Sequence, residues 1–448
     1  MKLWDKNSTT EERILSFTTG MDPLFDRQLA PYDVAGSMAH AIMLGEVGLI
    51  QKEEGEKLVE TLKSLFEEAQ KGLLDLEDGV EDIHSQVEIM LTRKLGDLGK
   101  RIHTGRSRND QVMVDIKLFL RDSFQVLAEA VSKLARSLLQ QARIHQQVRM
   151  PGYTHMQVAM PSSFGLWLGA YAEALADDLV LMKGVYRLIN QNPLGSAAGF
   201  GSSFPLDREM TTRLLGFDGM HISSVNAQMN RGKTEWYAAS AISAIASTVS
   251  RLAMDMVLFM GQNFNFLSLP TELTTGSSIM PHKKNPDVLE LIRARCNRLV
   301  QLPAGISSVT SNLISGYHRD FQVLKEMLHP ALDELGSCLE MMGFVVDRIR
   351  VNPEILKDET YRYLYTVEEV NARVMKGVPF RDAYREVAED IEQDRYRPGR
   401  EPAYTHLGSV GNPGLTLIEN KLDQSFGAFG FVRMSDIVEA MSSYYGKK

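Results

Sequence analysis

The sequence predicts an all-α protein organised around a long central helical bundle. Prolines number only 16 in 448 residues, and β-branched runs bounded by turn residues are rare. The stretch 110–147 contains neither proline nor glycine. Further long segments downstream repeat the helical spacing of apolar residues. Together these observations favour a helical bundle over a sheet-based fold.

In the stretch 110–147 the apolar side chains recur every three or four residues, which places them on one face of a helix. As one continuous helix this stretch would be about 55 Å long, at ~1.5 Å per residue. A helix of this length needs partners along its apolar face. The apolar stripe consists of Ile116, Leu120, Phe124, Leu127, Val131, Leu134 and Leu138.

Three more long helices are expected downstream. One covers residues 162–190, and a second covers residues 233–264 and is rich in Ala and Ser, so that neighbours can approach it closely. A further helix begins at Pro286, with Asn285 as its N-cap and Asp287 in its first turn. Such long helices stabilise one another by packing side by side in a bundle.

Composition excludes several classes of protein. The formal net charge is −8, so nothing attracts the chain generally to nucleic acid or to an anionic membrane. Cys296 and Cys338 are too few for a disulfide framework, and no Cys/His spacing indicates zinc, which fits a reducing cytoplasm. The N-terminus lacks the apolar core of a signal peptide, and segment 238–260 is expected to be a buried bundle helix.

The segment TTGSSIMPHKKNP, residues 274–286, has the composition of a mobile catalytic loop. Gly276 gives it freedom, and the hydroxyls of Ser277 and Ser278 are followed by the cation of Lys283. Such a loop can carry a base into a site and exclude water as it closes. Lys283 and the following helix start can stabilise charge on a carboxylate. The alternative is an ordinary polar loop before a helix.

Two other polar segments precede long helices. HTGRSRND, residues 103–110, places Arg108 next to Ser107, and the arginine fork suits a carboxylate. In PGYTHMQ, residues 151–157, His155 can act as a general acid or base near neutral pH. The alternatives are solvated arginines in the first segment and a structural histidine in the second.

Two further groups of polar residues lie on predicted helices. Glu290 follows the catalytic-loop candidate and can orient a nearby histidine, or it can pair on the surface with Arg293 or Arg295. In GYHRDFQVLKE, residues 316–326, Gln322 and Lys325 share a helical face. The alternative for that segment is a solvated amphipathic helix.

Together these motifs, in this order and at these separations, resemble the fumarase/aspartase superfamily of homotetrameric lyases. GSSIMPHKKNP resembles the superfamily signature, and HTGRSRNDQ and GYTHMQ resemble regions that distinguish one branch of it. The resemblance covers nearly the whole chain. It implies a three-domain, all-α fumarase/aspartase-like fold with a five-helix bundle in the middle domain. Four subunits would join their bundles into a twenty-helix core, and each active site would be assembled from three chains. The expected domains are 1–105, 106–355 and 356–448.

The resemblance also implies how the residues would act. Ser277 would remove a proton from the carbon next to a carboxylate, and Lys283 and Asn285 would stabilise the resulting aci-carboxylate. His155, oriented by Glu290, would give a proton to the leaving amine. The division of the base and acid roles between Ser277 and His155 stays open.

The remaining residues implied by the resemblance bind the substrate, and no metal or organic cofactor is expected. They are Ser107, Arg108, Asn109 and Thr154 for carboxylates, Tyr317, Gln322 and Lys325 for other parts of the substrate, and Asp26 and Asp33 for its guanidinium and amino end.

HTGRSRND and GYTHMQ favour the branch that eliminates a guanidine from a substituted succinate and releases fumarate. The alternatives are another substituted-succinate lyase, such as adenylosuccinate lyase, and an inactive, crystallin-like structural relative. A nucleotide substrate would require a clearer phosphate-binding cluster, and the complete set of elimination residues disfavours the inactive relative. Departures from the family pattern at 4–8, 223–233 and 323–324 concern the amine half of the substrate.

Overall fold

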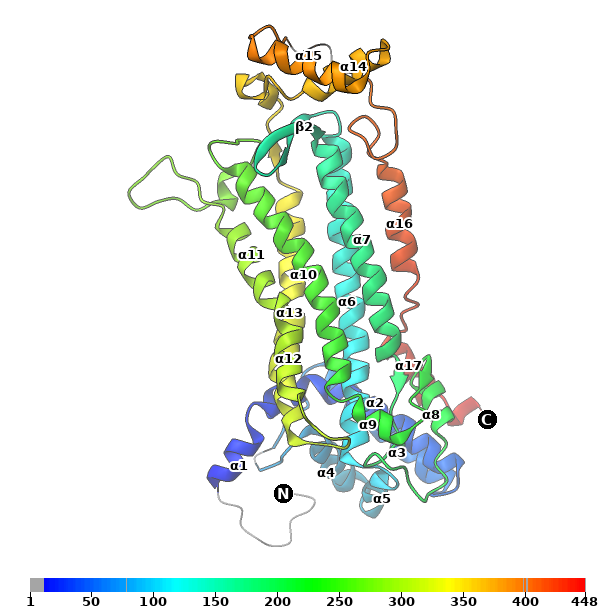
Figure 1. The fold of residues 1–448 in the computed structure, drawn as a ribbon. Helices are drawn as coiled ribbons and strands as arrows, with labels where there is room; N and C mark the ends of the chain where they lie inside the picture. Colours follow the sequence, from blue (N-terminus) through cyan, green and yellow to red (C-terminus); the bar gives the residue numbers. More distant parts are fainter. Residues whose placement is uncertain (1–11, 78, 398, 400–401, 448) are drawn as a thin grey trace.

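The computed structural model describes residues 12–447 except 78, 398, 400 and 401. The molecule is elongated, with long helices side by side through its centre and shorter elements at both ends (Figure 1). The prediction of a predominantly helical chain is confirmed, and the strands of the described part are short. The family departure expected at residues 4–8 lies outside the described residues.

Long helices in five columns form the central bundle, which confirms the predicted architecture of this part. They contact one another along their lengths, and their buried apolar side chains form one continuous core. The columns are α6 (Arg108–Ile144), α7 (Phe164–Ile189), α10 (Lys233–Met260), α11 (Asp287–Val300) followed by α12 (Leu302–Thr310), and α13 (Val323–Val346).

Helix α6 is the helix predicted over 110–147, and all seven residues of its predicted stripe are buried. Its start is set by a capping box. The Ser107 hydroxyl oxygen accepts the backbone N–H of Asn109 at 3.3 Å, and the Asp110 carboxylate accepts the backbone N–H of Ser107 at 2.9 Å. Because the cap lies at Ser107, Arg108 and Asn109 project from the first helical turn.

The start of α11 differs from the prediction, since Asn285 does not cap the helix. The helix begins at Asp287 without a side-chain cap. The backbone N–H of Asn285 donates to the carbonyl of Thr275 at 2.8 Å, and the N–H of Thr275 donates back at 3.1 Å. The Asn285 amide also donates to the carbonyl of Gly276 at 3.3 Å. These bonds close the neck of loop 276–284, so Asn285 belongs to the loop.

Shorter helices form the base of the molecule around the start of α6 (Figure 1). A second core cluster lies among α2, α3, α4 and neighbouring segments. The helices at this end are α1 (Glu12–Thr19), α2 (Asp22–Glu46), α3 (Lys52–Gln70), α4 (Ile83–Leu95), α5 (Asp97–Lys100), α8 (Arg208–Leu214) and α9 (Ser224–Met229).

The strands pair as three two-stranded sheets. The hairpin that follows α6 is the longest, and its two-residue turn consists of His155 and Met156, whose φ angles are 52° and 58°. Positive φ at both positions is what a type I′ turn requires. The pairs are β1 (Arg149–Thr154) with β2 (Gln157–Ser163), β3 (Gln191–Asn192) with β4 (Gly219–Met220), and β5 (Leu267–Ser268) with β6 (Arg350–Val351).

The C-terminal part of the chain spans the length of the molecule (Figure 1). Helices α14 and α15 lie at the end opposite the base and share a third, small core. Helix α16 packs along α6 and α7, and α17 packs against α2 and α3. The chain after 355 therefore contributes to all three cores, and the division at 105 and 355 stays a prediction. The helices are α14 (Thr366–Met375), α15 (Phe380–Glu392), α16 (Leu415–Gly427) and α17 (Met434–Ser442).

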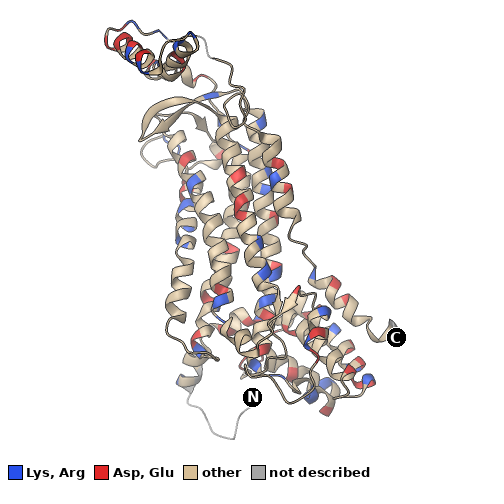
Figure 2. Ribbon diagram, turned by 45° about the vertical axis from the view of Figure 1, so that its right-hand side comes forward, with Lys and Arg blue, Asp and Glu red and all other residues tan. Residues whose placement is uncertain are grey.

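Among the described helices, α10 alone is long and apolar enough to cross a membrane, and 50% of its most apolar stretch is buried inside the molecule. It contacts α7, α11 and α13, as the sequence predicts for a bundle helix. Figure 2 shows Lys and Arg interspersed with Asp and Glu along the helices.

Candidate active site

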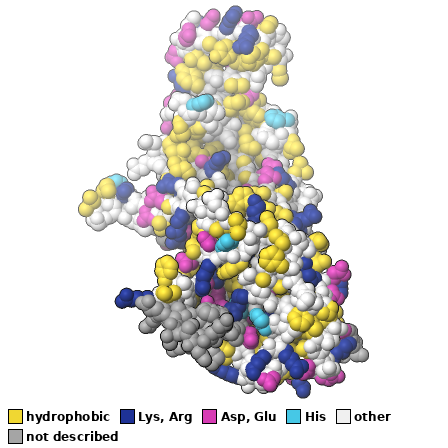
Figure 3. Space-filling view, turned by 60° about the horizontal axis from the view of Figure 1, so that its bottom comes forward, with side chains coloured by type: hydrophobic (Ala, Val, Ile, Leu, Met, Phe, Trp, Pro, Cys, Tyr) yellow, Lys and Arg dark blue, Asp and Glu magenta, His cyan; other side chains and the backbone are white. Residues whose placement is uncertain are grey.

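A cavity of about 600 Å³ opens at the base of the bundle. It lies where α2, α4, the first turn of α6 and the segment before α13 meet. Figure 3 views this end of the molecule, where acidic, basic and histidine side chains lie close together. The volume suits a small-molecule ligand, and the mixture of carboxylates and cations suits one that carries both charges.

Lys325 is at the centre of an ion-pair group in the cavity wall. Its Nζ lies 2.7 Å from Oδ1 of Asp22 and 2.7 Å from Oδ1 of Asp26. The two aspartates are one helical turn apart on α2, so both reach the same lysine. Burial raises the pKa of Asp22 to about 6, although Lys325 opposes the change. Burial opposes the charge of Lys325, but the two aspartates raise its pKa, so the lysine stays charged.

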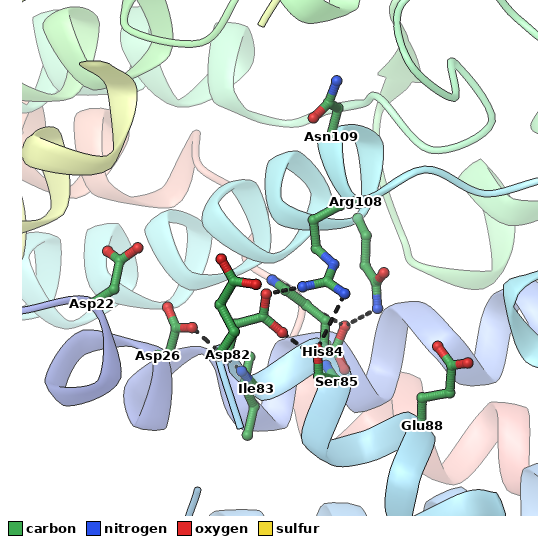
Figure 4. A network of polar contacts seen from close by, with 12 residues as sticks. Asp22, Asp26, Asp82, Ile83, His84, Ser85, Glu88, Arg108 and Asn109 are labelled. Atoms are coloured by element: carbon green, nitrogen blue, oxygen red, sulfur yellow. Dashed lines mark hydrogen bonds and ion pairs between the residues drawn. The ribbon is translucent and has the colours of Figure 1, made fainter. Parts of the chain in front are cut away.

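Arg108 projects into the cavity from the first turn of α6 (Figure 4). Its guanidinium forms an ion pair with Asp82, and its Nη2 donates to the hydroxyl of Ser85 at 3.2 Å. Asp82 also caps α4 by accepting the backbone N–H of Ser85 at 2.8 Å. The side chain of Asn109 lies nearby and points away from this pair (Figure 4). Arg108 therefore already holds a carboxylate, the kind of group that it is expected to bind.

The short helix η3 (Arg319–Gln322) forms another part of the wall. The Gln322 amide donates to the carbonyls of residues 18 and 19 at 2.8 and 3.0 Å, and so holds the segment before α2. Arg319 donates to Gln322 at 3.0 Å and to Glu81 at 3.0 Å. These bonds tie three sequence-distant segments into one wall.

The loop that carries Ser277 lies at the other end of the bundle, where it projects from the body between α10 and α11 (Figure 1). The Ser277 hydroxyl oxygen is held by the backbone N–H groups of Ile279 and Met280 at 3.4 and 3.2 Å. Lys283 is exposed to solvent. The loop is thus closed at its neck, and its tip is free of the rest of the described chain.

His155 lies at the tip of the β1–β2 hairpin and is exposed. The hairpin follows the end of α6, whereas Arg108 begins that helix. With 37 residues, α6 places its two ends about 55 Å apart at ~1.5 Å per residue. The expected elimination residues and the base cavity therefore lie at opposite ends of one chain.

The structure separates the expected site residues into two groups. Six line the base cavity, and Ser107 caps α6 beside it, whereas Asp33 lies buried behind the wall. The six are Asp26, Arg108, Asn109, Tyr317, Gln322 and Lys325. The group at the opposite end consists of Thr154, His155, Ser277, Lys283, Asn285 and Glu290.

Sequence reasoning missed Asp22, which shares Lys325 with Asp26. The available signal was its spacing, since Asp22 precedes Asp26 by one helical turn. His84 was also unassigned. With Asp33 and Asp115 it forms a buried group whose ligand atoms all lie within 4.8 Å of one another, the kind of spacing at which a metal ion can bind.

Comparison with known proteins gives consistent results. The family model described as Lyase matches residues 10–301. The argininosuccinate lyase of Phocaeicola vulgatus is 54% identical over 96% of this chain and 96% of its own length. That of Parabacteroides distasonis is 53% identical over 97% of this chain and 98% of its own length.

Solved structures share the fold. EDDS lyase in complex with formate superimposes with a TM-score of 0.79 at 23% identity, covering 98% of this chain and 95% of the other. Class II fumarase from Schistosoma mansoni gives a TM-score of 0.70 at 16% identity, covering 100% and 97%. With near-full-length relatives at more than half identity, the chain belongs to the argininosuccinate lyases of the fumarase/aspartase superfamily.

Proposed function

We propose that this chain cleaves argininosuccinate reversibly into arginine and fumarate, in the cytoplasm, as a step of arginine biosynthesis. The single observation that carries the proposal is the base cavity, whose charged wall suits a zwitterionic substrate, in a chain 54% identical to an argininosuccinate lyase. The chemistry needs proton transfer and charge stabilisation, which side chains supply, so we expect no metal or organic cofactor.

The elimination half of the reaction is assigned to the residues at the far end of the bundle. Ser277 takes the proton from the carbon next to a carboxylate, and the electron pair is held as an aci-carboxylate by Lys283 and Asn285. The carbon–nitrogen bond then breaks, the carbon–carbon double bond of fumarate forms, and His155 protonates the leaving guanidine. Glu290 orients His155.

The substrate-binding half is assigned to the base cavity and its surroundings. Ser107, Arg108, Asn109 and Thr154 hold carboxylates. The amine end lies near the ion-pair group of Lys325 and Asp26, with Tyr317 and Gln322 beside it. Arg108 binds the substrate by exchanging its ion pair with Asp82 for an ion pair with a carboxylate of the substrate.

A homotetramer with shared active sites is the assembly that we propose. The separation of about 55 Å along α6 supports it, because one chain cannot bring its own Ser277 to its own Arg108. In a bundle of four chains with neighbours antiparallel, the base of one subunit lies beside the far end of another. Bundle-to-bundle packing would also bring partners to the outer faces of these long helices.

The first test is to mix the purified protein with argininosuccinate and follow the absorbance of fumarate. Turnover should be well above that with adenylosuccinate under the same conditions. A preference for adenylosuccinate would show that the proposed substrate is wrong. Absence of turnover with both compounds would support the alternative that the chain is an inactive structural relative.

The second test addresses shared sites. Arg108→Ala and Ser277→Ala, each inactive alone, are unfolded together and refolded as mixed tetramers. Sites that take Arg108 from one variant chain and Ser277 from the other are intact, so a fraction of wild-type activity should return. The control pair Ser277→Ala and Lys283→Ala should regain little, because both residues belong to one loop. Inactivity of the first mixture, with mixed tetramers demonstrated, would disprove shared sites.

A further inference from the structure

His84 lies in the wall of the base cavity with one edge of its ring turned towards two buried carboxylates. Its Nδ1 is 2.9 Å from Oδ1 of Asp33 on α2 and 3.3 Å from Oδ2 of Asp115 on α6. His84 is 4% exposed, and both aspartates are completely buried. The Gln111 amide also donates to Oδ1 of Asp33, at 2.6 Å. Three helices therefore fix the orientation of one imidazole.

These distances require a proton on Nδ1. An unprotonated nitrogen would point its lone pair at the Asp33 carboxylate oxygen 2.9 Å away, and that buried carboxylate would then lose a hydrogen-bond donor. A buried carboxylate also needs a cation nearby, and the His84 ring is in contact with Asp33 and Asp115. Arg106 contributes a second positive charge that acts on Asp33 and Asp115.

Electrostatics favour the charged form of the ring as well. Burial opposes the charge of His84, but the attraction of Asp33 and then of Asp115 raises its pKa above the usual value. Burial also opposes the charge of Asp33, yet the His84 cation holds the pKa of Asp33 below its usual value. Burial raises the pKa of Asp115 well above the usual range, so Asp33 is the charged partner.

The opposite edge of the ring, Nε2, remains for the cavity. His84 belongs to the cavity lining, and no residue in the described part of the chain makes a hydrogen bond to Nε2. Its sequence neighbour Ser85 accepts a hydrogen bond from Arg108, so the imidazole and the guanidinium belong to the same part of the wall (Figure 4). A cavity whose lining includes both an imidazolium and a guanidinium suits a carboxylate.

We propose that His84 is a substrate-binding residue, an imidazolium whose Nε2–H donates a hydrogen bond to the carboxylate of the amine half of the substrate. Asp33 is then a positioning residue, because it acts only through the ring. The inference rests on the proposed cleavage of argininosuccinate, and it assigns His84 to the half that is released as arginine. A metal ion bound to His84, Asp33 and Asp115 is the competing explanation of the same cluster.

The main test is His84→Gln, which keeps a hydrogen-bond donor but removes the charge. A hydrogen bond to a charged group is worth roughly 10- to 100-fold in binding. The KM for argininosuccinate and the inhibition constant of arginine should therefore rise together by that factor, while kcat and the inhibition constant of fumarate change less than about threefold. His406→Gln, which alters an exposed histidine of the C-terminal segment, is the control and should match the wild type.

The comparison of the two products separates the possible failures. If the wild type does not cleave argininosuccinate, the proposed function fails. The assignment of His84 is wrong if the wild type is active but His84→Gln leaves the inhibition constant of arginine unchanged. It is also wrong if the variant raises the inhibition constants of arginine and fumarate equally. Dialysis against EDTA should leave the wild-type KM unchanged, and a rise in KM that one metal reverses would establish the competing explanation.

Asp33→Asn gives a second test that does not alter the ring. Without the Asp33 charge the pKa of His84 should fall, because burial opposes the charge of the ring and its strongest attraction is removed, so the imidazolium is lost at a lower pH than in the wild type in a titration from pH 6 to pH 8. The KM of this variant should then rise about tenfold over that range relative to the wild type. A wild-type pH profile in a correctly assembled variant would overturn the proposal. The other titratable and charged groups around the ring are Asp26 on α2, Arg106 just before α6, Arg108 and Asp115 on α6, Glu88 on α4 and His103 on η1 (Arg101–His103).

Discussion

The buried lysine of α6 offers a direct test of how the bundle is stabilised. Lys117 is completely buried, and its Nζ lies 3.4 and 3.3 Å from the carbonyl oxygens of Leu188 and Ile189. These carbonyls end α7, where the helix dipole favours a cation. Burial nevertheless lowers the pKa of Lys117 to about 7, against the attraction of Glu235.

The size and sign of the effect follow from linkage. Because the pKa of Lys117 falls from 10.5 to about 7, the free energy of unfolding is lower by about 5 kcal/mol when this lysine is charged than when it is neutral. Between those pH values the unfolded chain binds more protons than the folded chain. The stability contributed by Lys117 therefore increases with pH, by about 2 kcal/mol per subunit from pH 7 to pH 9.

Lys117→Met removes the titration and keeps the shape of the side chain. We expect the stability of the wild type relative to this variant to rise by about 2 kcal/mol from pH 7 to pH 9, measured by urea unfolding at fixed protein concentration. Lys133→Met, at an exposed position of α6, should give a difference that does not depend on pH. A pH-independent difference for Lys117→Met would refute the reasoning.

Two further predictions concern the loop that carries Ser277 and the C-terminal tail. Ser277→Ala should lower kcat by several orders of magnitude while substrate still binds, measured by turnover and by direct binding; loss of activity in Ser278→Ala instead would move the assignment by one residue. Gly55→Ala places a methyl group against the hydroxyl oxygen of Tyr445 and should cost about 1–3 kcal/mol in thermal unfolding. In a Tyr445→Ala background Gly55→Ala should no longer have that cost, and a cost that persisted there would contradict the contact.

The sequence predicted the bundle well because helical periodicity reports burial directly. Every residue of the apolar stripe of α6 is buried, and α7 and α10 lie within the predicted ranges. The prediction that Asn285 caps α11 was wrong for a local reason. Asn285 has the chemistry of an N-cap, but backbone pairing with Thr275 takes it into the loop neck. Competition between two local structures is not visible in the residue types alone.

The candidate site was predictable only where its residues belong to recognisable motifs. Arg108 and Lys325 were found in this way, and the structure brings both to one cavity. The partner of Lys325 could not be chosen from the sequence, because Asp26 lies 299 residues away. The charge of His84 depends on its burial and on two aspartates from other helices, and neither feature can be read from the residues beside His84 in the sequence.

The turn that presents His155 has a consequence for engineering. His155 and Met156 both adopt positive φ, a conformation that costs a residue other than glycine or asparagine roughly 1 kcal/mol or more. Directed evolution for heat resistance would therefore favour His155→Asn and Met156→Gly, the preferred pair for such a turn. Under the proposed mechanism the first change removes the proton donor and the second does not. Thermal optimisation and catalysis are thus opposed at one position of this turn and compatible at the next.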